Sequence, residues 1–479
     1  MSKSLYINGV WQEGHGDKFT SANPSDGTKL WSGHAASDAD VDQAFEAAHD
    51  AFEGWSRTPL KERMAIVGKY KNLAMAAKES MGELIAKETG KQLWDALGEG
   101  GALSAKVDIS LTAYEDRTGA LSRETAFGHA ALQHRAHGVM AVLGPYNFPA
   151  HLPNGQILPA LIAGNTVVFK PSEQTPAVGE ALIKIYAEAG FPAGVINMVQ
   201  GAKVTGAAIL DHPKLDGVLF TGSANTGAFI HKKFGGRPEV VLALEMGGNN
   251  PLIVWDVKDA EAAASIIAQS AFITTGQRCT CARRLIVADN AKGEAIIDAV
   301  ASFIDRISLG AWDEEATLGP LISADIAAHV VKNANALGGK AIREAKISEQ
   351  GAAYVTPGLY DVTYVDVADE EIFGPVLQVT RVADWDAAIA AANNTKFGLA
   401  AGLISDDAAL WEDFRLRIRA GVVNFNRPTT GAASFLPFGG PGASGNHSPG
   451  AYYAADFCAW PMASQVADVP ENLPMKGLK

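Results

Sequence analysis

The stretch from residue 138 to 244 alternates short, fully apolar runs with longer segments of helical periodicity, and this alternation limits the fold more than any other feature. Strands that are apolar throughout belong to parallel sheets whose two faces are covered by helices. We therefore expect an α/β fold, with one parallel sheet here and a second α/β unit over residues 252–423. The expected strands are 139–143, 166–169, 195–199, 217–220 and 240–244, separated by helices at 153–163, 177–189, 204–210 and 226–233.

The first third of the chain is expected to be mostly helical. Ser37 or Asp38 is suited to cap a helix with an apolar face, and a second helix is expected to run from 60 to about 89 and to end at Gly90. The polar stretch 118–137 alternates like a strand pair, which predicts an exposed hairpin. Because the edge of an exposed strand needs a cover, another subunit would be one solution.

Charge and cysteine content exclude several classes of protein. The net charge is −13, so we expect neither a non-specific nucleic-acid binder nor a protein adsorbed to an anionic membrane. No apolar run reaches about 18 residues, and the first residues lack the basic-then-apolar pattern of a signal peptide. Three cysteines, an odd and low number, favour the reducing cytoplasm.

Two segments predict a dinucleotide site. At Phe220–Gly227 a strand ends, a glycine turns the chain and a helix begins, so helix N-terminal amides and the Ser223 hydroxyl can hold a pyrophosphate. Lys170 and Glu173 follow another strand, where a carboxylate favours the ribose of NAD over the 2′-phosphate of NADP. An ordinary turn and a solvated ion pair are the alternatives. The Gly-x-Gly-x-x-Gly pattern at 440–445 follows no strand and opens no helix, so we reject it as a nucleotide site.

Three further residues have the chemistry of a catalytic centre. Cys279 lies in Gly276-Gln-Arg-Cys279 and is a candidate nucleophile, Glu245 follows a strand as a candidate general base, and Asn147 offers an amide to an oxyanion. A buried inert thiol, a structural carboxylate and a turn asparagine are the corresponding alternatives. Cys279 and Cys281 alone supply two metal ligands where zinc needs three or four, so we expect no metal site.

Taken together, these motifs resemble the aldehyde dehydrogenase superfamily. Seven segments occur in the family's order over nearly the whole chain: 145–149, 170–173, 220–227, 244–248, 276–279, 371–375 and 437–440. The resemblance implies that Cys279 is the nucleophile, that Glu245 is the base, and that Asn147 and the Cys279 backbone N–H form the oxyanion hole. It also implies an NAD site made of Lys170, Glu173, Gly222, Ser223, Ala224, Asn225, Thr226, Gly227, Glu371 and Phe373. Tyr146 stands where many relatives have Trp, which keeps an aromatic wall.

The family's architecture implies a Rossmann-type coenzyme domain (1–117 and 138–246), an α/β catalytic domain (247–450) and a small β oligomerisation hairpin (118–137 with 451–479) that joins subunits into a homodimer or a dimer of dimers. Segments 144–155, 276–284, 439–447 and 453–461 are most similar to a subgroup that oxidises an acidic semialdehyde of arginine catabolism. Oxidation of succinate or glutamate semialdehyde, a CoA-acylating reaction and a catalytically silent structural protein remain alternatives. Glu245 argues against the CoA reaction, and the intact catalytic residues argue against the last.

Recognition of a dianionic semialdehyde by a protein of net charge −13 requires local cations. Arg278 adjoins the nucleophile, and His447 lies in the glycine-rich loop that forms one wall of the entrance in the family. Arg427 and His151 are weaker candidates. The alternative for Arg278 is that it braces a neighbouring loop.

Overall fold

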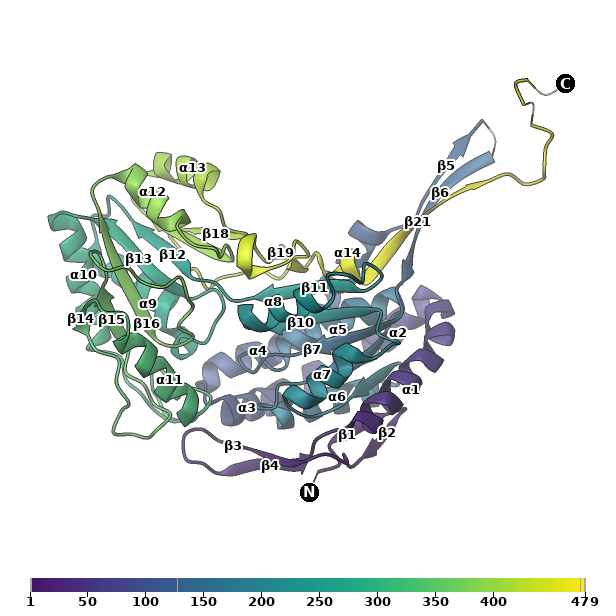
Figure 1. Cartoon of the computed structure of the whole chain (residues 1–479), viewed down its shortest axis with the longest axis horizontal. Helices are drawn as coiled ribbons and strands as arrows, with labels where there is room; N and C mark the ends of the chain where they lie inside the picture. Colours follow the sequence, from purple (N-terminus) through teal and green to yellow (C-terminus); the bar gives the residue numbers. More distant parts are fainter. Residues whose placement is uncertain (1, 127, 474, 478–479) are drawn as a thin grey trace.

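The first sheet is a doubly covered, mostly parallel sheet of seven strands in the order β11-β10-β7-β8-β9-β1-β2 (Figure 1). The computed structural model describes residues 2–126, 128–473 and 475–477. The parallel strands and their connecting helices are β7 (Val139–Leu143), α5 (His151–Ala163), β8 (Thr166–Lys170), α6 (Pro176–Ala189), β9 (Ile196–Met198), α7 (Lys203–Asp211), β10 (Gly217–Gly222), α8 (Ala224–Lys233) and β11 (Val241–Met246). The expected strand and helix order of this unit is confirmed, with bounds shifted by one or two residues.

Helices cover both faces of this sheet, which explains why its strands are apolar throughout. Along β7, Met140 and Val142 join one buried cluster, whereas Val139, Ala141 and Leu143 join the other. Chain order reverses between β7 and β10, since β8 and β9 lie on one side of β7 and β10 and β11 on the other. In such sheets ligands bind at the carboxyl ends of the strands near this reversal.

The helices of the first third are α1 (Asp38–Arg57), α2 (Leu60–Ala76), α3 (Lys78–Thr89) and α4 (Leu93–Thr118). Ser37 caps α1 in a reciprocal capping box with Asp40. The single helix expected over 60–89 is two helices, because the chain breaks at Ala77, and the second ends at Gly90, whose φ is 77°. A left-handed residue at that position favours glycine.

The first third of the chain was expected to be mostly helical, but it begins with four strands. They are β1 (Leu5–Ile7), β2 (Val10–Gln12), β3 (Lys18–Ala22) and β4 (Lys29–His34). Two of them have only three residues, too few to show a period of two. β1 pairs antiparallel with β9 and so extends the first sheet, while β3 and β4 form a hairpin of their own.

The second lobe holds another seven-stranded sheet, in the order β14-β15-β16-β13-β12-β17-β18, and most of its strands are labelled in Figure 1. This sheet is parallel except at β14, and the second α/β unit expected from the sequence is confirmed. Its elements are β12 (Asn250–Val254), α9 (Ala260–Phe272), β13 (Ala282–Ala288), α10 (Ala291–Ile304), α11 (Ala324–Asn335), β14 (Lys340–Arg343), β15 (Gly358–Asp361), β16 (Val376–Val382), α12 (Trp385–Asn393), β17 (Ala400–Ile404), α13 (Ala408–Arg417) and β18 (Val422–Phe425).

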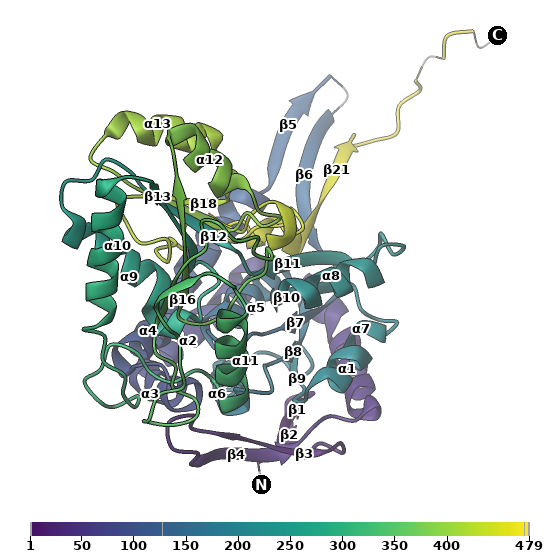
Figure 2. The same ribbon diagram turned by 60° about the vertical axis from the view of Figure 1, so that its left-hand side comes forward.

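A three-stranded sheet projects away from both lobes, as Figures 1 and 2 show. It consists of β5 (Leu121–Thr125), β6 (Gly128–Ala136) and β21 (Ala459–Val466), which follows the short helix α14 (Ala454–Cys458). The hairpin expected over 118–137 is therefore present, and the C-terminal segment pairs with it along the whole of β6. Every residue of β5, the edge strand, is exposed. The domain boundaries drawn at these points remain predictions.

Among the described residues, no helix is long and apolar enough to cross a membrane. The same part of the chain contains no group of three or more side chains placed to hold a metal ion.

Candidate active site

The loop that carries Cys279 has an unusual backbone. It follows α9 through a 3-10 turn (Ile273–Gly276) in which Thr274, Thr275 and Gly276 have φ values of 55°, 53° and 71°. A Cβ on Gly276 would lie 2.1 Å from the carbonyl oxygen of Gly374, so only glycine fits there. A residue other than glycine in the left-handed backbone region costs conformational energy, and such residues are concentrated at functional sites.

Cys279 is the least buried of the three cysteines. All three cysteines are free, but Cys281 and Cys458 are buried, whereas Cys279 is partly exposed. Asn250, at the start of β12, holds the loop: its side-chain nitrogen donates to the carbonyl oxygens of Cys279 (2.7 Å) and Cys281 (2.9 Å). Asn250 was not identified from the sequence, although it lies only two residues after the motif 244–248.

Burial raises the pKa of the Cys279 thiol to about 12, and the nearby carboxylates Glu371 and Glu245 act in the same direction. The guanidinium of Arg283 opposes this shift. At neutral pH the thiol of this arrangement is therefore protonated, and an attack requires that its proton be removed.

Glu245 lies near the end of β11 and is 8% exposed. Its Oε1 accepts a hydrogen bond from the backbone N–H of Gly450 (2.9 Å), whereas Oε2 is buried and has no hydrogen-bond partner among the described residues. Burial raises the pKa of this carboxyl to about 8. A carboxyl with one free oxygen and a pKa near neutrality is suited to take a proton from water.

Asn147 is held beside the nucleophile loop. Its side-chain nitrogen donates to the backbone carbonyl oxygen of Gln277 (3.0 Å), and the backbone carbonyl oxygen of Asn147 accepts a hydrogen bond from Lys91 (2.7 Å). Lys91 in turn forms a buried ion pair with Glu99 (2.9 Å). An amide nitrogen carries two hydrogens, so the bond to Gln277 leaves one donor for an oxyanion. The supporting pair Lys91–Glu99 was not found from the sequence.

The candidate ribose site lies at the end of β8. Lys170 is buried and donates to the carbonyl oxygens of Pro171 (2.9 Å) and Gly201 (2.8 Å). Its nitrogen lies 3.6 Å from a carboxylate oxygen of Glu173, whose side chain is 46% exposed. This geometry leaves the Glu173 carboxylate available to accept hydrogen bonds from ribose hydroxyls.

The candidate pyrophosphate site is the start of α8. Ser223 caps the helix by accepting a hydrogen bond from the Thr226 N–H (3.3 Å). A Cβ on Gly227 would lie 2.1 Å from the sulfur of Met246, so glycine allows the helix to pack close to β11. Gly222, Ala224 and Asn225 complete this turn and, like Ser223, are at least partly accessible.

Glu371 and Phe373 both contact Arg283, a buried cation that was not identified from the sequence. Arg283 is fully buried; it donates to Glu371 Oε1 (3.1 Å) and to the carbonyl oxygens of Gly374 (3.2 Å) and Arg278 (3.1 Å). Its guanidinium also lies over the Phe373 ring, and Tyr146 meets that ring edge-on. The two adjacent arginines, Arg283 and Arg284, at the start of the otherwise apolar strand β13 were the signal available in the sequence.

The candidate substrate residues have different surroundings. Arg278 forms an ion pair with Asp95 (2.7 Å) and donates to the Thr274 hydroxyl (2.8 Å), which favours the bracing role. His447 is exposed and has a φ of 66°, while Arg427 is exposed. His151 lies in the first turn of α5, and its Nδ1 is buried without a hydrogen-bond partner among the described residues.

The glycine-rich stretch 440–445 packs against the Glu245 segment of β11. Gly445 forms a β-bridge with Glu245, and Ser444 donates to the carbonyl oxygen of Gly247 (2.8 Å). These contacts favour a structural role for the loop over nucleotide binding.

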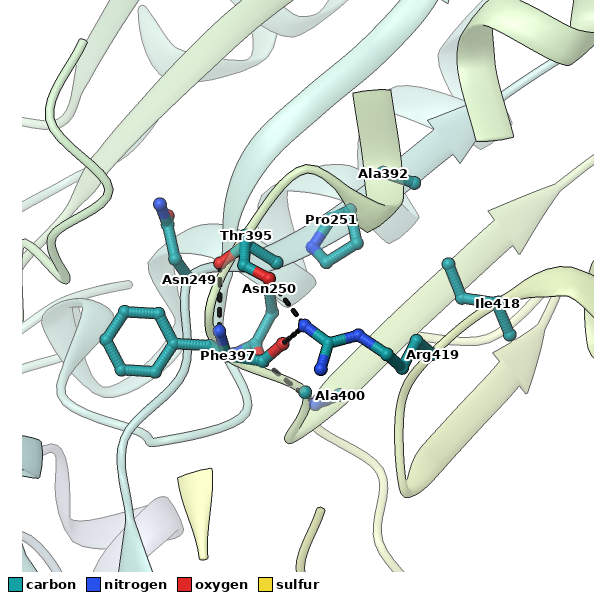
Figure 3. A pocket seen from close by; sticks show the side chains of 10 residues that line it. Asn249, Asn250, Pro251, Ala392, Thr395, Phe397, Ala400, Ile418 and Arg419 are labelled. Carbon is teal, nitrogen blue, oxygen red and sulfur yellow. Dashed lines mark hydrogen bonds between the residues drawn. The ribbon is translucent and has the colours of Figure 1, made fainter. Parts of the chain in front are cut away.

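A small pocket lies at the other end of Asn250 (Figure 3). Asn250 Oδ1 accepts from the Ala400 N–H (2.9 Å), while the Arg419 guanidinium donates to the carbonyl oxygens of Thr395 and Phe397. Cys279, Glu245 and Asn147 do not line it, so this pocket is separate from the three candidate catalytic residues.

The sequence model of the Aldehyde dehydrogenase family matches residues 11–460. An N-succinylglutamate 5-semialdehyde dehydrogenase of Caulobacter sp. is 53% identical over 484 aligned residues, which cover 100% of both chains. The protein of the same name from Salmonella heidelberg is 52% identical and covers 96% of this chain and 95% of its own.

Solved structures show the same fold. A 1-pyrroline-5-carboxylate dehydrogenase from Thermus with bound NAD superposes with a TM-score of 0.91 at 29% identity, covering 96% of this chain and 92% of its own. An NADP-dependent glyceraldehyde-3-phosphate dehydrogenase from Bacillus halodurans, complexed with NADP, has a TM-score of 0.88 at 29% identity and covers 96% and 98%. Structural relatives therefore bind either dinucleotide.

Proposed function

This chain belongs to the aldehyde dehydrogenase family, and from that membership we propose that it oxidises N-succinyl-L-glutamate 5-semialdehyde to N-succinyl-L-glutamate, with NAD, in arginine catabolism. The observation that carries the proposal is the identity of 53% with an enzyme of that name over the full length of both chains. The accessible Cys279 beside the raised-pKa Glu245 supports it, because these are the two groups that the reaction requires.

The first half of the reaction joins the substrate to Cys279. The thiol loses its proton to solvent water, the thiolate sulfur attacks the aldehyde carbon, and the carbonyl oxygen becomes an oxyanion. The side-chain amide of Asn147 and the Cys279 backbone N–H stabilise that charge. The resulting thiohemiacetal then loses a hydride from its carbon and becomes a thioester.

The second half releases the acid. Glu245 takes a proton from a water molecule, whose oxygen attacks the thioester carbon while the bond from carbon to sulfur breaks. The departing thiolate takes the proton back from Glu245, so the products are the carboxylic acid and the free Cys279 thiol. Splitting oxidation and hydrolysis in this way avoids one difficult concerted step.

The residues present fit a dinucleotide. The half-exposed Glu173 beside Lys170 and the Ser223-capped start of α8 have the donors and acceptors that a ribose and a pyrophosphate need. NAD would supply the acceptor for the hydride when bound. Lys170, Glu173, residues 222–227, Glu371 and Phe373 would hold it, and the free Glu173 carboxylate favours NAD over NADP.

The remaining parts of the proposal concern the assembly and its location. The exposed edge of β5 supports a homodimer or a dimer of dimers, because an uncovered strand edge readily pairs with another chain. The three free thiols fit the reducing cytoplasm. His447, from the loop that follows Gly440, is the proposed substrate contact at the entrance.

Initial rates of NADH formation test the proposal. The purified protein is assayed with NAD against the semialdehydes of N-succinylglutamate, succinate and glutamate, and against propanal, each with and without CoA. We expect the highest kcat/KM with N-succinylglutamate semialdehyde and no requirement for CoA. A higher kcat/KM with another semialdehyde, or activity only with CoA, would replace the proposed substrate or reaction.

A further inference from the structure

Lys106 is a buried ammonium group without a compensating charge. It lies in the middle of α4 and is 2% exposed. Its Nζ donates one hydrogen bond, to the carbonyl oxygen of Ala451 (2.9 Å), and forms no ion pair with any carboxylate in the described ranges 2–126, 128–473 and 475–477. Lysine is almost never fully buried unless it is paired, because an ion taken out of water needs a counter-charge.

Glu99, a buried carboxylate on the same helix, already has partners of its own. Glu99, on α4, accepts hydrogen bonds from Lys91 and from the backbone N–H groups of Ala150 and His151. Lys91 and Glu99 neutralise each other, so the net charge of Lys91, Glu99 and Lys106 together is +1. Cys458, which also faces Lys106, does not change that balance, because burial raises the pKa of its thiol and keeps it neutral.

The packing between Gly155 on α5 and Lys106 is open enough for an added group. A Cβ on Gly155 would lie 3.6 Å from Cε of Lys106, and apart from α5's own backbone and the neighbours of Gly155, no other heavy atom of the described residues lies within 4 Å of that position. Gly155 is partly exposed. His151 lies one turn earlier on the same face of α5, with its buried Nδ1 unpartnered among the described residues. Two polar groups of unmet hydrogen-bonding capacity therefore border one accessible face of α5.

This face is continuous with the reaction centre. α5 begins four residues after Asn147, the proposed oxyanion donor. Ala451, which accepts the Lys106 hydrogen bond, directly follows Gly450, whose N–H binds Glu245. Lys106 is therefore linked through Ala451 to the segment that binds Glu245, and it packs against the helix that follows Asn147.

We propose that Lys106, assisted by His151, binds a carboxylate of the substrate and so selects acidic semialdehydes over neutral aldehydes. This inference rests on the proposed function, because it names the group that reads the charge of that substrate. Burial lowers the pKa of Lys106 to about 8, which leaves most of the ammonium protonated at pH 7. The role is distinct from that of Arg278, whose charge is already paired with Asp95.

The test compares Lys106→Met with Lys69→Met, which removes the same charge from an exposed position on α2. For Lys106→Met we expect kcat/KM with N-succinylglutamate semialdehyde to fall about 10- to 100-fold, mainly through KM, as for the loss of a hydrogen bond to a charged group. The fall with propanal should be at least tenfold smaller. Lys69→Met should change neither value. Equal losses with both substrates would overturn the proposal and would assign Lys106 to support of the Gly450–Ala451 segment.

A second measurement separates this inference from the proposed function. N-succinyl-L-glutamate is used as an inhibitor of propanal oxidation, and we expect its inhibition constant to rise at least tenfold in Lys106→Met. An unchanged constant would overturn the carboxylate site even in an enzyme that prefers the proposed semialdehyde. If the wild-type protein has no such preference, the proposed function fails, and the inhibition constant alone decides the role of Lys106. Thermal melting checks the fold, and Lys106→Gln serves if the Met variant is unfolded.

Discussion

Raising the pH should accelerate hydrolysis of the acyl enzyme, because the competent form of Glu245 is the carboxylate. Burial raises its pKa from the usual value to about 8, so the group is mostly protonated at pH 7 and gains its charge as the pH rises. A group with this pKa is about 10% ionised at pH 7 and about 90% at pH 9. The hydrolysis step should therefore become roughly tenfold faster over that interval.

Rapid mixing with NAD and the semialdehyde measures this step. The burst of NADH reports acylation, and the steady phase that follows reports hydrolysis when hydrolysis is the slower step. In Glu245→Gln we expect a burst of about one NADH per active site, then a slow phase that no longer responds to pH. Glu239→Gln, which removes an exposed carboxylate, is the control and should behave as wild type. A wild-type steady phase that is flat from pH 6 to 9 would refute the assignment, since an ordinary carboxylate is fully ionised in that range.

Three further variants test the site. Glu173→Gln should lower the ratio of kcat/KM with NAD to kcat/KM with NADP by about tenfold. The carboxylate repels a 2′-phosphate by about 4 kcal/mol at 4 Å before screening, and solvent reduces this repulsion at a half-exposed position. Dinucleotide titrations with a fixed aldehyde measure the ratio, and an unchanged ratio removes Glu173 from the ribose site. Arg278→Ala should lower kcat/KM equally for charged and neutral aldehydes, since the Asp95 ion pair makes the side chain a brace; a loss confined to dianionic substrates would assign it to recognition instead. Arg283→Met should destabilise the protein by about 3 kcal/mol, because it leaves Glu371 buried without its cation; denaturant unfolding measures this, and a loss below about 1 kcal/mol contradicts it.

The sequence was sufficient for the parts of the fold that have a strong period. The apolar runs of the first sheet predicted β7 to β11 to within two residues, because parallel strands buried on both faces have no competing pattern. β1 and β2 were missed because three residues show no period, and β1 is held by its antiparallel pairing with β9, far along the chain. The break at Ala77 depends on packing between helices that no local signal describes.

Some residues of the candidate site could likewise be predicted from local sequence, and others could not. Cys279, Glu245 and Asn147 lie in glycine- or proline-marked segments after strands or helices, so local sequence pointed to them. Lys106 and Arg283 were missed because the role of a buried cation depends on partners that are distant in the sequence. Lys106 donates to Ala451, and Arg283 pairs with Glu371. Arg278 shows the converse: its place beside the nucleophile suggested substrate binding, whereas its pairing with Asp95 favours a brace.

Mass spectrometry of the trapped intermediate tests the central claim most directly. Glu245→Gln is mixed with NAD and N-succinylglutamate semialdehyde, quenched in acid and digested. We predict one N-succinylglutamyl group on the peptide that contains Cys279 and Cys281, assigned by fragmentation to Cys279, and its absence when NAD is omitted. An acyl group on Cys281 or Cys458, or NADH formed in the burst without any acylated cysteine, would contradict the account.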